Sequence, residues 1–401
     1  MRRLVLFMTS ALSLLAAGHA AAATFYVSPN GSDGAAGTSP ATAWQTVSKV
    51  NATHLAPGDR VLFKGGAAFA GLLQPQGSGA SGSPIVFGSY DGGRANLSGG
   101  IQLQSQSWLS FDGLRVDTGA WRHAGDTRGI RTSDSGSGVQ NVAVSNSQFV
   151  NVAIGLLFSN HRDRDWTISN NLIQNTRDSG ILIFDPNVQN EIGASHLTFT
   201  GNQILDTGLD KSIAWKKHAV YDIGTDLVWR NNVIRRFSEG GFSLRARGNT
   251  LIGNTISDGP YAIYYSPYDS TPGKTTIAHN RISNVTQGSI TLDSSGNVAD
   301  VESFVLANNS IVAKGTAPGI RILGTSGSVT IVNNLVQVQQ GPVFRIDRLP
   351  GQGLTERSNL WWSTTGTPTW GFLGRGFSTL ADYVAASGRG AADRVSSLLH
   401  P

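Results

Sequence analysis

The stretch TISNNLI, residues 167–173, carries a motif that returns throughout the middle of the chain. An alternating run leads into a residue pair that ends in Asn171, and an apolar residue follows two positions later. Matching segments, spaced 22 to 31 residues apart, place one serine and otherwise asparagines at Ser147, Asn202, Asn232, Asn254, Asn280, Asn309, Asn334 and Asn359. A repeat this short cannot bury its apolar face alone, so we expect stacked copies to form a solenoid.

The residues inside each repeat indicate strands. Each repeat has room for two or three short strands of β-branched residues with period-two alternation, but not for the helix of a βαβ unit. The spaced leucines of a leucine-rich repeat are absent. Asparagine tolerates left-handed backbone, and its amide both donates and accepts, so Asn side chains at one turn of every coil can form a hydrogen-bonded column. We therefore predict an all-β fold of stacked coils.

The composition excludes other classes of protein. Only 14% of the 401 residues are charged, which argues against a disordered chain, and 49 glycines argue against a helical bundle. The chain has no cysteine, so the fold must hold without disulfides. Lys and Arg exceed Asp and Glu by 31 to 26, which fits an anionic partner such as an acidic polysaccharide. We expect no nucleic-acid binding, no membrane insertion and a monomer.

Residues 1–23 have the pattern of a secretory signal peptide, with two arginines, an apolar run and small residues at the end. We therefore expect a bacterial protein that is secreted or periplasmic. The remainder, residues 24–401, is expected to form a single domain. We place an N-terminal cap at about 24–70, the coils at about 71–362 and a C-terminal cap at about 363–401.

The asparagine column, the coil length and the opening segment FYVSPNGSDGAAGTSPATAWQTVSKVNATHLAPGDRVLFKGG, residues 25–66, resemble the right-handed parallel β-helix proteins of the pectate-lyase-like superfamily. The resemblance covers nearly all of the chain after the signal peptide. It implies a single-stranded right-handed parallel β-helix with capped ends. Short amphipathic cap helices are expected within residues 42–52 and 378–388, the second ending at Gly388.

A further strand follows the Asn turn in each coil, and in relatives of this fold these strands carry the active cleft. We place them at residues 128–133, 155–160, 180–185, 218–223, 241–246, 261–266, 289–294 and 319–324. In GFSLRAR, alternation makes Phe242 and Leu244 the inward residues, so Ser243, Arg245 and Arg247 face out.

The same alternation predicts the neighbours of Arg245. On the preceding coil it turns His218 and Asp222 outward, with Asp222 beside Arg245. On the following coil it turns Tyr265 outward, or Tyr264 if the parity of that strand is inverted.

These residues suit the chemistry of a uronate polymer. Its C5 proton can be removed only if the adjacent carboxylate is neutralised, and the arginine fork of Arg245 matches a carboxylate in two contacts. The base stays open between His218 and Lys217, and the acid between Tyr265 and Arg245. Elimination would make the protein a polysaccharide lyase, whereas reprotonation on the opposite face would make it a C5-epimerase. Predicted substrate-binding residues are Trp215, Lys216, Asp222, Arg247 and Tyr268.

Arg245 in SLRARG also resembles the catalytic arginine in the LxLRHG segment of the family 6 polysaccharide lyases. This chain differs from the pattern of those lyases at two positions. Those lyases place a lysine on the preceding coil where this chain has Ile223, and a histidine after the arginine where it has Ala246. Only the role of Arg245 is therefore implied by the resemblance.

Other readings stay open. We expect no cofactor, although Asp163, Asp165 and Asp185 could together bind Ca²⁺. A glycoside hydrolase would need two carboxylates about 5–10 Å apart across the cleft, for which Asp185, Asp222 and Asp293 are the candidates. The fold would also suit a non-catalytic glycan-binding protein, in which Arg245 and Asp222 form only an ion pair.

Overall fold

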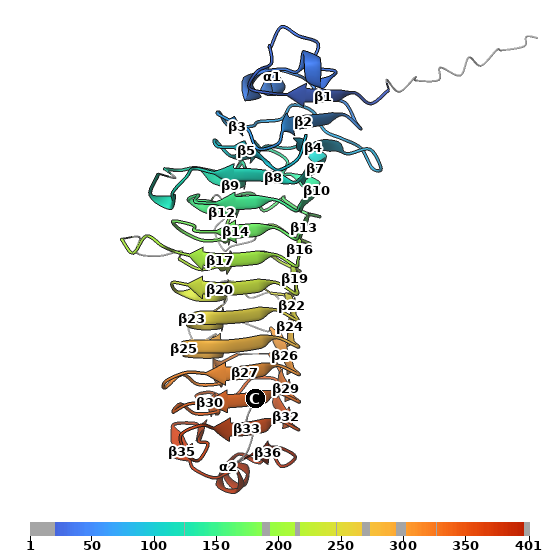
Figure 1. The fold of residues 1–401 in the computed structure, drawn as a ribbon. Helices are drawn as coiled ribbons and strands as arrows, with labels where there is room; N and C mark the ends of the chain where they lie inside the picture. The colour runs from blue at the N-terminus through green and yellow to red at the C-terminus, as the bar shows by residue number, and fades with distance from the viewer. Residues whose placement is uncertain are drawn as a thin grey trace, which may run out of the picture.

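The computed structural model describes residues 21–123, 125–186, 193–212, 217–245, 247–266, 273–293, 302–325 and 327–396. These residues wind into one elongated stack of coils that runs from the N-terminal to the C-terminal end (Figure 1). The signal peptide predicted at 1–23 lies almost wholly outside the described residues. No helix in the described part of the chain is long and apolar enough to cross a membrane.

Each full coil contributes three strands, and each strand pairs in parallel with its counterpart on the next coil. The first sheet contains β1 (Thr24–Val27), β2 (Arg60–Lys64), β4 (Ile85–Tyr90), β7 (Ser107–Asp112), β10 (Gln140–Ser145), β13 (Thr167–Ser169), β16 (Thr198–Thr200), β19 (Val228–Arg230), β22 (Thr250–Ile252), β24 (Lys274–Ala278), β26 (Ser303–Ala307), β29 (Val329–Val332) and β32 (Leu354–Arg357).

The second sheet contains β3 (Ala68–Phe69), β5 (Ala95–Leu97), β8 (Leu114–Asp117), β11 (Gln148–Val150), β14 (Leu172–Gln174), β17 (Gln203–Thr207), β20 (Val233–Phe237), β27 (Ser310–Ala313), β30 (Leu335–Val338), β33 (Leu360–Ser363) and β36 (Arg394–Val395). Two long strands, β23 (Thr255–Tyr265) and β25 (Arg281–Asp293), begin in this sheet and continue into the third.

The third sheet contains the C-terminal halves of those two strands and β6 (Ile101–Leu103), β9 (Arg128–Thr132), β12 (Ile154–Phe158), β15 (Ile181–Ile183), β18 (Val220–Asp222), β21 (Gly240–Leu244), β28 (Ile320–Gly324), β31 (Phe344–Ile346) and β34 (Trp370–Phe372). A further strand, β35 (Arg375–Phe377), pairs antiparallel with β34. The third sheet is the one predicted to carry the cleft. The predicted all-β, parallel β-helix architecture is confirmed.

The predicted column of asparagines lies between the first and second sheets. In Asn254, Nδ2 donates to the carbonyl oxygen of Trp229 at 2.9 Å and to Oδ1 of Asn280 at 3.0 Å. Its Oδ1 accepts from the backbone N and Nδ2 of Asn232, each at 3.0 Å. Bonds of this kind link, in order, Ser147, Asn171, Asn202, Asn232, Asn254, Asn280, Asn309, Asn334 and Asn359. Each buried amide is satisfied by its neighbours in the column and by a backbone carbonyl of the preceding coil, so the column fixes the register of the coils.

The end of the column and its turns add two details to the prediction. The last amide, Asn359, meets a carboxylate, because Oδ1 of Asp393 accepts from its backbone N at 2.9 Å. The left-handed residue is the one before each column position, as at Asn170, Asn231 and Asn308, with φ between 53° and 55°. One residue of each pair therefore forms the turn, and the next forms the column.

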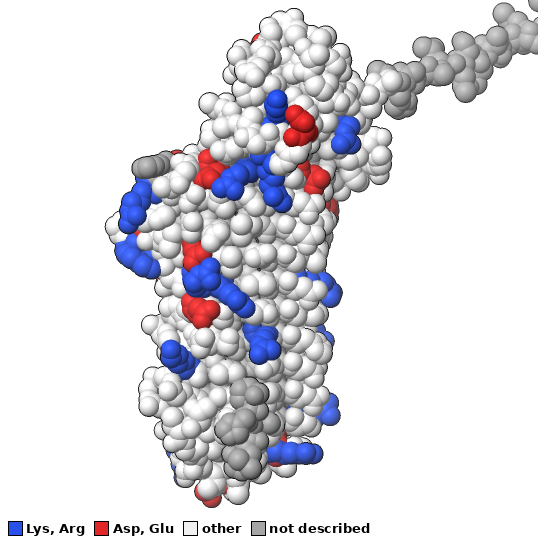
Figure 2. All heavy atoms as spheres, viewed as in Figure 1, with Lys and Arg blue, Asp and Glu red and all other residues white. Residues whose placement is uncertain are grey.

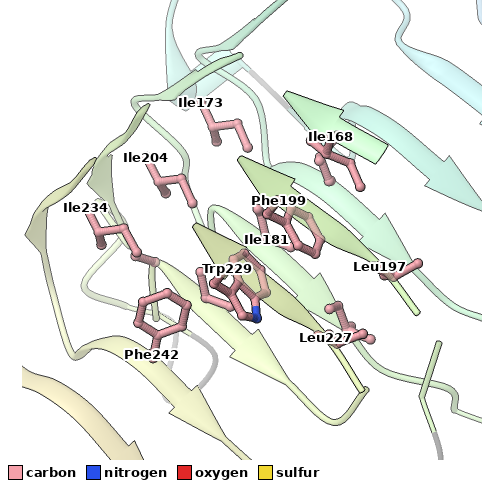
Figure 3. Close-up of a cluster of buried hydrophobic side chains, with 14 of the residues drawn as sticks. Ile168, Ile173, Ile181, Leu197, Phe199, Ile204, Leu227, Trp229, Ile234 and Phe242 are labelled. Carbon is pink, nitrogen blue, oxygen red and sulfur yellow. The ribbon is translucent and has the colours of Figure 1, made fainter. Parts of the chain in front are cut away.

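Like side chains stack on like inside the solenoid. Ile173, Ile204 and Ile234 are register partners on successive coils, and all three are buried (Figure 3). On the first sheet the rings of Phe199 and Trp229 stack with centroids 3.8 Å apart. Burying one such side chain contributes roughly 1.5–3 kcal/mol, so the repeated stacking stabilises the fold in place of disulfides.

Helices are short and concentrate near the ends of the stack. The helix α1 (Val47–Asn51) begins after Thr46, and α2 (Leu380–Ser387) ends at Gly388 with φ of 68°. Both helices fall within the segments expected to form cap helices. Two short 3₁₀ turns, η1 (Pro40–Thr42) and η2 (Trp121–His123), complete the described helical residues.

Candidate active site

A row of outward side chains crosses the third sheet at the middle of the stack. Tyr221 of β18 is the register partner of Ser243 in β21, and Ser243 is the partner of Tyr264 in β23. The flanking register partners Phe242 and Ile263 are fully buried in the core. Period-two alternation therefore turns Tyr221, Ser243 and Tyr264 away from the core.

The predicted outward orientations of Tyr265 and Asp222 are wrong. Tyr265 is 1% exposed and packs in the core against Phe304, with ring centroids 4.6 Å apart. The inverted parity, which turns Tyr264 outward, is the correct one. Asp222 is also inside the solenoid, where Oδ1 accepts from the backbone N of Gly224 at 2.7 Å. Burial raises the pKa of Asp222 to about 7.

The error at Asp222 has a local cause. The prediction carried alternation from Ala219 through the whole segment, but the strand begins only at Val220, after a bend at Ala219. Both Ala219 and Val220 are buried, so the parity shifts by one residue at the bend. Asp222 consequently pairs with Leu244 rather than with Arg245.

Arg245 lies directly after β21, and its backbone N donates to the carbonyl oxygen of Asp222 at 2.7 Å. Its guanidinium carbon is 5.8 Å from the ring centroid of Tyr221 and 5.6 Å from that of Tyr264. Nη1 donates to the carbonyl oxygen of Ser266 at 3.1 Å. Because Ser243 between the two tyrosines is small, the guanidinium can lie between their rings. The predicted outward position of Arg245 is confirmed.

His218 precedes the bend and faces the same region as Arg245. Its Nε2 is 3.7 Å from Oε2 of Glu239, which comes from the turn before β21. Burial, and then the positive charge of Arg245, lower the pKa of His218 to about 4. The carboxylate of Glu239 acts in the opposite direction, but burial and the charge of Arg245 outweigh it. His218 is therefore neutral at pH 7 and able to accept a proton.

Tyr264 is held on the other side of Arg245. Its hydroxyl donates to Oδ2 of Asp293 at 2.7 Å. Burial, together with this bond and the charge of Asp293, raises the pKa of Tyr264 to about 12. The phenol therefore keeps its proton at neutral pH. Tyr261 lies beside it, with ring centroids 5.7 Å apart.

These side chains enclose a pocket of about 240 Å³ lined by His218, Glu239, Gly240, Arg245, Tyr261 and Tyr264. The atoms Nδ1 of His218 and Oε2 of Glu239 are buried there and have no hydrogen-bond partner among the described residues. Buried polar atoms without protein partners are typical of sites that bind water or a ligand. The pocket thus combines a neutral base, a fixed cation and a protonated phenol.

The other predicted residues lie elsewhere. Lys217 is placed against Gly208, and Arg247 is buried against Gly273 and Glu302 beyond the end of β21. Neither lines the pocket. Trp215, Lys216 and Tyr268 lie outside the described residues.

The sequence did not identify three of the residues that line the pocket. Alternation does not single out Glu239 or Tyr261, because Glu239 lies in the turn before β21 and Tyr261 follows a register shift within β23. Tyr264 was named only as the inverted alternative, and the sequence YAIYYS fits both parities equally well.

The candidate calcium ligands do not converge. Asp163 is fully buried and accepts from the backbone N of Val139 at 2.8 Å. Asp185 is bound to His161, whose Nδ1 lies 2.7 Å from its Oδ2, and Asp165 lies beside Arg164. Across the described ranges, no group of three or more His, Cys, Asp or Glu side chains is suitably placed for a metal ion. Asp163, Asp165 and Asp185 thus form no such group.

One face of the molecule shows how charged side chains are arranged there. The face in Figure 2 carries basic and acidic side chains in mixed groups separated by uncharged surface. In the pocket of the third sheet, the cation Arg245 lies beside the neutral base His218.

Comparisons with known proteins agree with this architecture. The family model for the right handed beta helix region matches residues 190–343. The chain is a right-handed parallel β-helix protein. The right-handed parallel β-helix that the resemblance implied is thereby confirmed. A comparison with curated proteins finds no match.

Three solved structures share the β-helix fold. The A-module of mannuronan C-5 epimerase AlgE6 from Azotobacter vinelandii is 11% identical, with a TM-score of 0.57 over 86% of this chain and 91% of its own. The family 6 polysaccharide lyase Pedsa3628 from Pseudopedobacter saltans is 14% identical, with a TM-score of 0.53 over 89% and 92%. XylC, solved in complex with xylose, is 8% identical, with a TM-score of 0.62 over 94% and 86%. At these identities the likeness shows the β-helix fold alone.

Proposed function

We propose that this β-helix protein is a polysaccharide lyase that cleaves a uronate-containing polymer by β-elimination. The observation that carries the proposal is the placing of Arg245 and a neutral His218 on one pocket. A lyase needs a cation to neutralise the uronate carboxylate and a base for the C5 proton. The export predicted from residues 1–23 belongs to the proposal, since it would bring the enzyme to such polymers outside the cytoplasm.

Each residue has a defined part in the reaction. Arg245 binds the carboxylate and stabilises the negative charge that develops when the C5 proton leaves. His218 takes that proton, for which its neutral imidazole is suited. The electron pair of the C5–H bond forms the C4–C5 double bond, and the C4–O bond breaks. Tyr264 turns its hydroxyl from Asp293 to the leaving oxygen and protonates it.

The proposal revises the assignments made from the sequence. His218 replaces the open choice of base, because Lys217 does not line the pocket. Tyr264 replaces Tyr265 as the acid, because Tyr265 is in the core. Arg245 keeps the role that the family 6 resemblance implied.

A glycoside hydrolase is the second candidate, and one observation favours it. Glu239 lines the pocket, and Asp293 is bound to the lining residue Tyr264, so two carboxylates serve the same pocket. In a hydrolase one carboxyl group must protonate the leaving oxygen while the other acts as base or nucleophile. The cation at Arg245 gives such an enzyme no advantage on a neutral sugar, which is why we favour elimination.

One experiment separates the candidates. The protein is incubated with alginate, polygalacturonate and glucuronan while the ultraviolet absorbance of unsaturated uronate and the number of reducing ends are followed together. A lyase raises both signals, a hydrolase raises only the reducing ends, and an epimerase changes the sugar composition without cleavage. Arg245→Ala should lower the lyase rate by about 10³-fold or more, while Arg235→Ala, at an exposed arginine of β20, should not. Full activity in Arg245→Ala, or no unsaturated product from any polymer, would refute the proposal.

A further inference from the structure

A second pocket lies on the third sheet toward the C-terminal end. It has a volume of about 460 Å³ and is enclosed by β31, β34 and β35. Its size falls in the range of ligand-binding clefts. Two arginines, Arg345 and Arg375, line it together with Phe372 and Phe377.

The space exists because glycines take the places of side chains. In the hairpin, Gly371 is the register partner of Arg345 in β31, and a Cβ at Gly371 would lie 3.0 Å from Cγ of that arginine. Gly376, paired with Gly371 across the hairpin, has nothing within 4 Å of its missing Cβ. Both positions face the pocket.

The tip of the hairpin carries a feature that stability alone does not explain. Leu373 adopts a left-handed backbone with φ of 49°, and its neighbour Gly374 has φ of 83°. A two-residue turn with both φ values positive suits a hairpin, but a leucine there costs roughly 1 kcal/mol. Leu373 is also 48% exposed. A strained and exposed apolar residue beside a pocket is typical of a binding site rather than of a packing element.

One of the two cations of the pocket, Arg345, is held in place by an ion pair. Nε and Nη2 of Arg345 donate to Oδ1 of Asp347 at 2.9 and 2.7 Å, and Nε of Arg321 donates to Oδ2 at 2.8 Å. One carboxylate thus orients two guanidinium groups and leaves a net positive charge. The exposed Arg375 lies over the ring of Phe377, and no ion pair among the described residues involves it.

The two pockets lie along one row of the sheet. From Tyr264 the outward register continues through Thr291 and Arg321 to Arg345. Three rungs at about 4.8 Å separate Tyr264 from Arg345, which places the pockets roughly 14 Å apart. A single polymer chain is long enough to reach both.

We infer that the pocket of Arg345 and Arg375 is a second binding site for an acidic saccharide, in which the two guanidinium groups contact a sugar carboxylate and the aromatic side chains contact the ring. The choice of an acidic sugar rests on the proposed function. Occupation of both sites by one chain would strengthen the binding of polymers through effective concentration, without acting on the reaction at Arg245.

The test measures binding separately from turnover. Calorimetry with hexamers of mannuronate and galacturonate, and with neutral cellohexaose, uses the His218→Ala protein so that substrate survives. Arg375→Ala should weaken binding of the best acidic hexamer about tenfold. Gly376→Phe should do the same by filling the pocket. Arg357→Ala, at an exposed arginine of β32 on the first sheet, is the matched control for lost charge.

The outcomes distinguish this inference from the proposed function. In the protein with His218 intact, Arg375→Ala should raise KM for the polymer and leave kcat unchanged. Equal binding by Arg375→Ala and Arg357→Ala, no effect of Gly376→Phe, or equally tight binding of cellohexaose would overturn the second site while leaving elimination intact. Binding that depends on Arg375 in a protein that forms no unsaturated product would support the second site and overturn the lyase.

Discussion

Tyr264 and Asp293 are joined by a 2.7 Å hydrogen bond at the edge of the pocket, whereas the next residue in the chain, Tyr265, points into the core. Two adjacent tyrosines therefore provide a matched pair. One can act on a ligand in the pocket, and the other can act only on stability.

Tyr264→Phe removes the proposed proton donor while keeping the ring beside Arg245. We expect the rate of elimination to fall by about 10²–10⁴-fold, the usual contribution of general acid catalysis. The melting temperature should change little, because the lost hydroxyl lies at the pocket. Tyr265→Phe should leave the rate within a factor of a few. Equal rates for the two variants would remove Tyr264 from the mechanism.

The pH dependence of stability should report the burial of His218. Its pKa is lowered from 6.5 to about 4 in the folded protein, so between these values the unfolded chain binds more protons. The free energy of unfolding therefore rises with pH across this window. The contribution of the neutral His218 is complete above about pH 6.5 and is lost as the pH falls toward 4. It amounts to roughly 3 kcal/mol at most. Urea unfolding of His218→Gln across this range should show a weaker dependence on pH than the original protein.

The exposed His54 supplies the control for this measurement. His54→Gln should keep the pH dependence of the original protein. The same pKa predicts that kcat/KM rises with pH on an acidic limb near pH 4 to 5 and then stays level through neutrality. A limb near the ordinary histidine value would contradict the buried, neutral state of His218.

The repeat made the fold predictable. The site was harder to predict, because it depends on which way individual side chains point. Nine column positions repeat one rule, so an error at one coil would be corrected by the others. Which of Tyr264 and Tyr265 faces outward depends on the alternation within one coil. A tyrosine suits both the core and the surface, so its residue type does not decide the orientation. At Asp222 a carboxyl group is buried against its usual preference, and a bend at Ala219 shifts the alternation. Composition and periodicity carry no signal for that bend.

The asparagine column should contribute strongly to stability. Asn254→Ala removes two donated and two accepted side-chain hydrogen bonds in the core and leaves their partners buried. An unsatisfied buried group costs about 1–3 kcal/mol, so we expect a loss of roughly 2–5 kcal/mol in the free energy of unfolding. Asn30→Ala, at an exposed loop position, should change it by less than about 0.5 kcal/mol. Similar losses for both variants in chemical denaturation would contradict the structural role of the column.

Gly240 should be needed for the position of His218 rather than for the fold. A Cβ added at Gly240 would lie 2.8 Å from Nδ1 of His218, too close for the imidazole to stay in place. A displacement of about 1 Å can lower a rate by about 10²-fold, so Gly240→Ala should lose activity on that scale. Gly366→Ala is the matched control, because its Cβ would meet no atom within 4 Å. If Gly240→Ala retained full activity and a melting temperature equal to that of Gly366→Ala, the base would have to be sought away from His218.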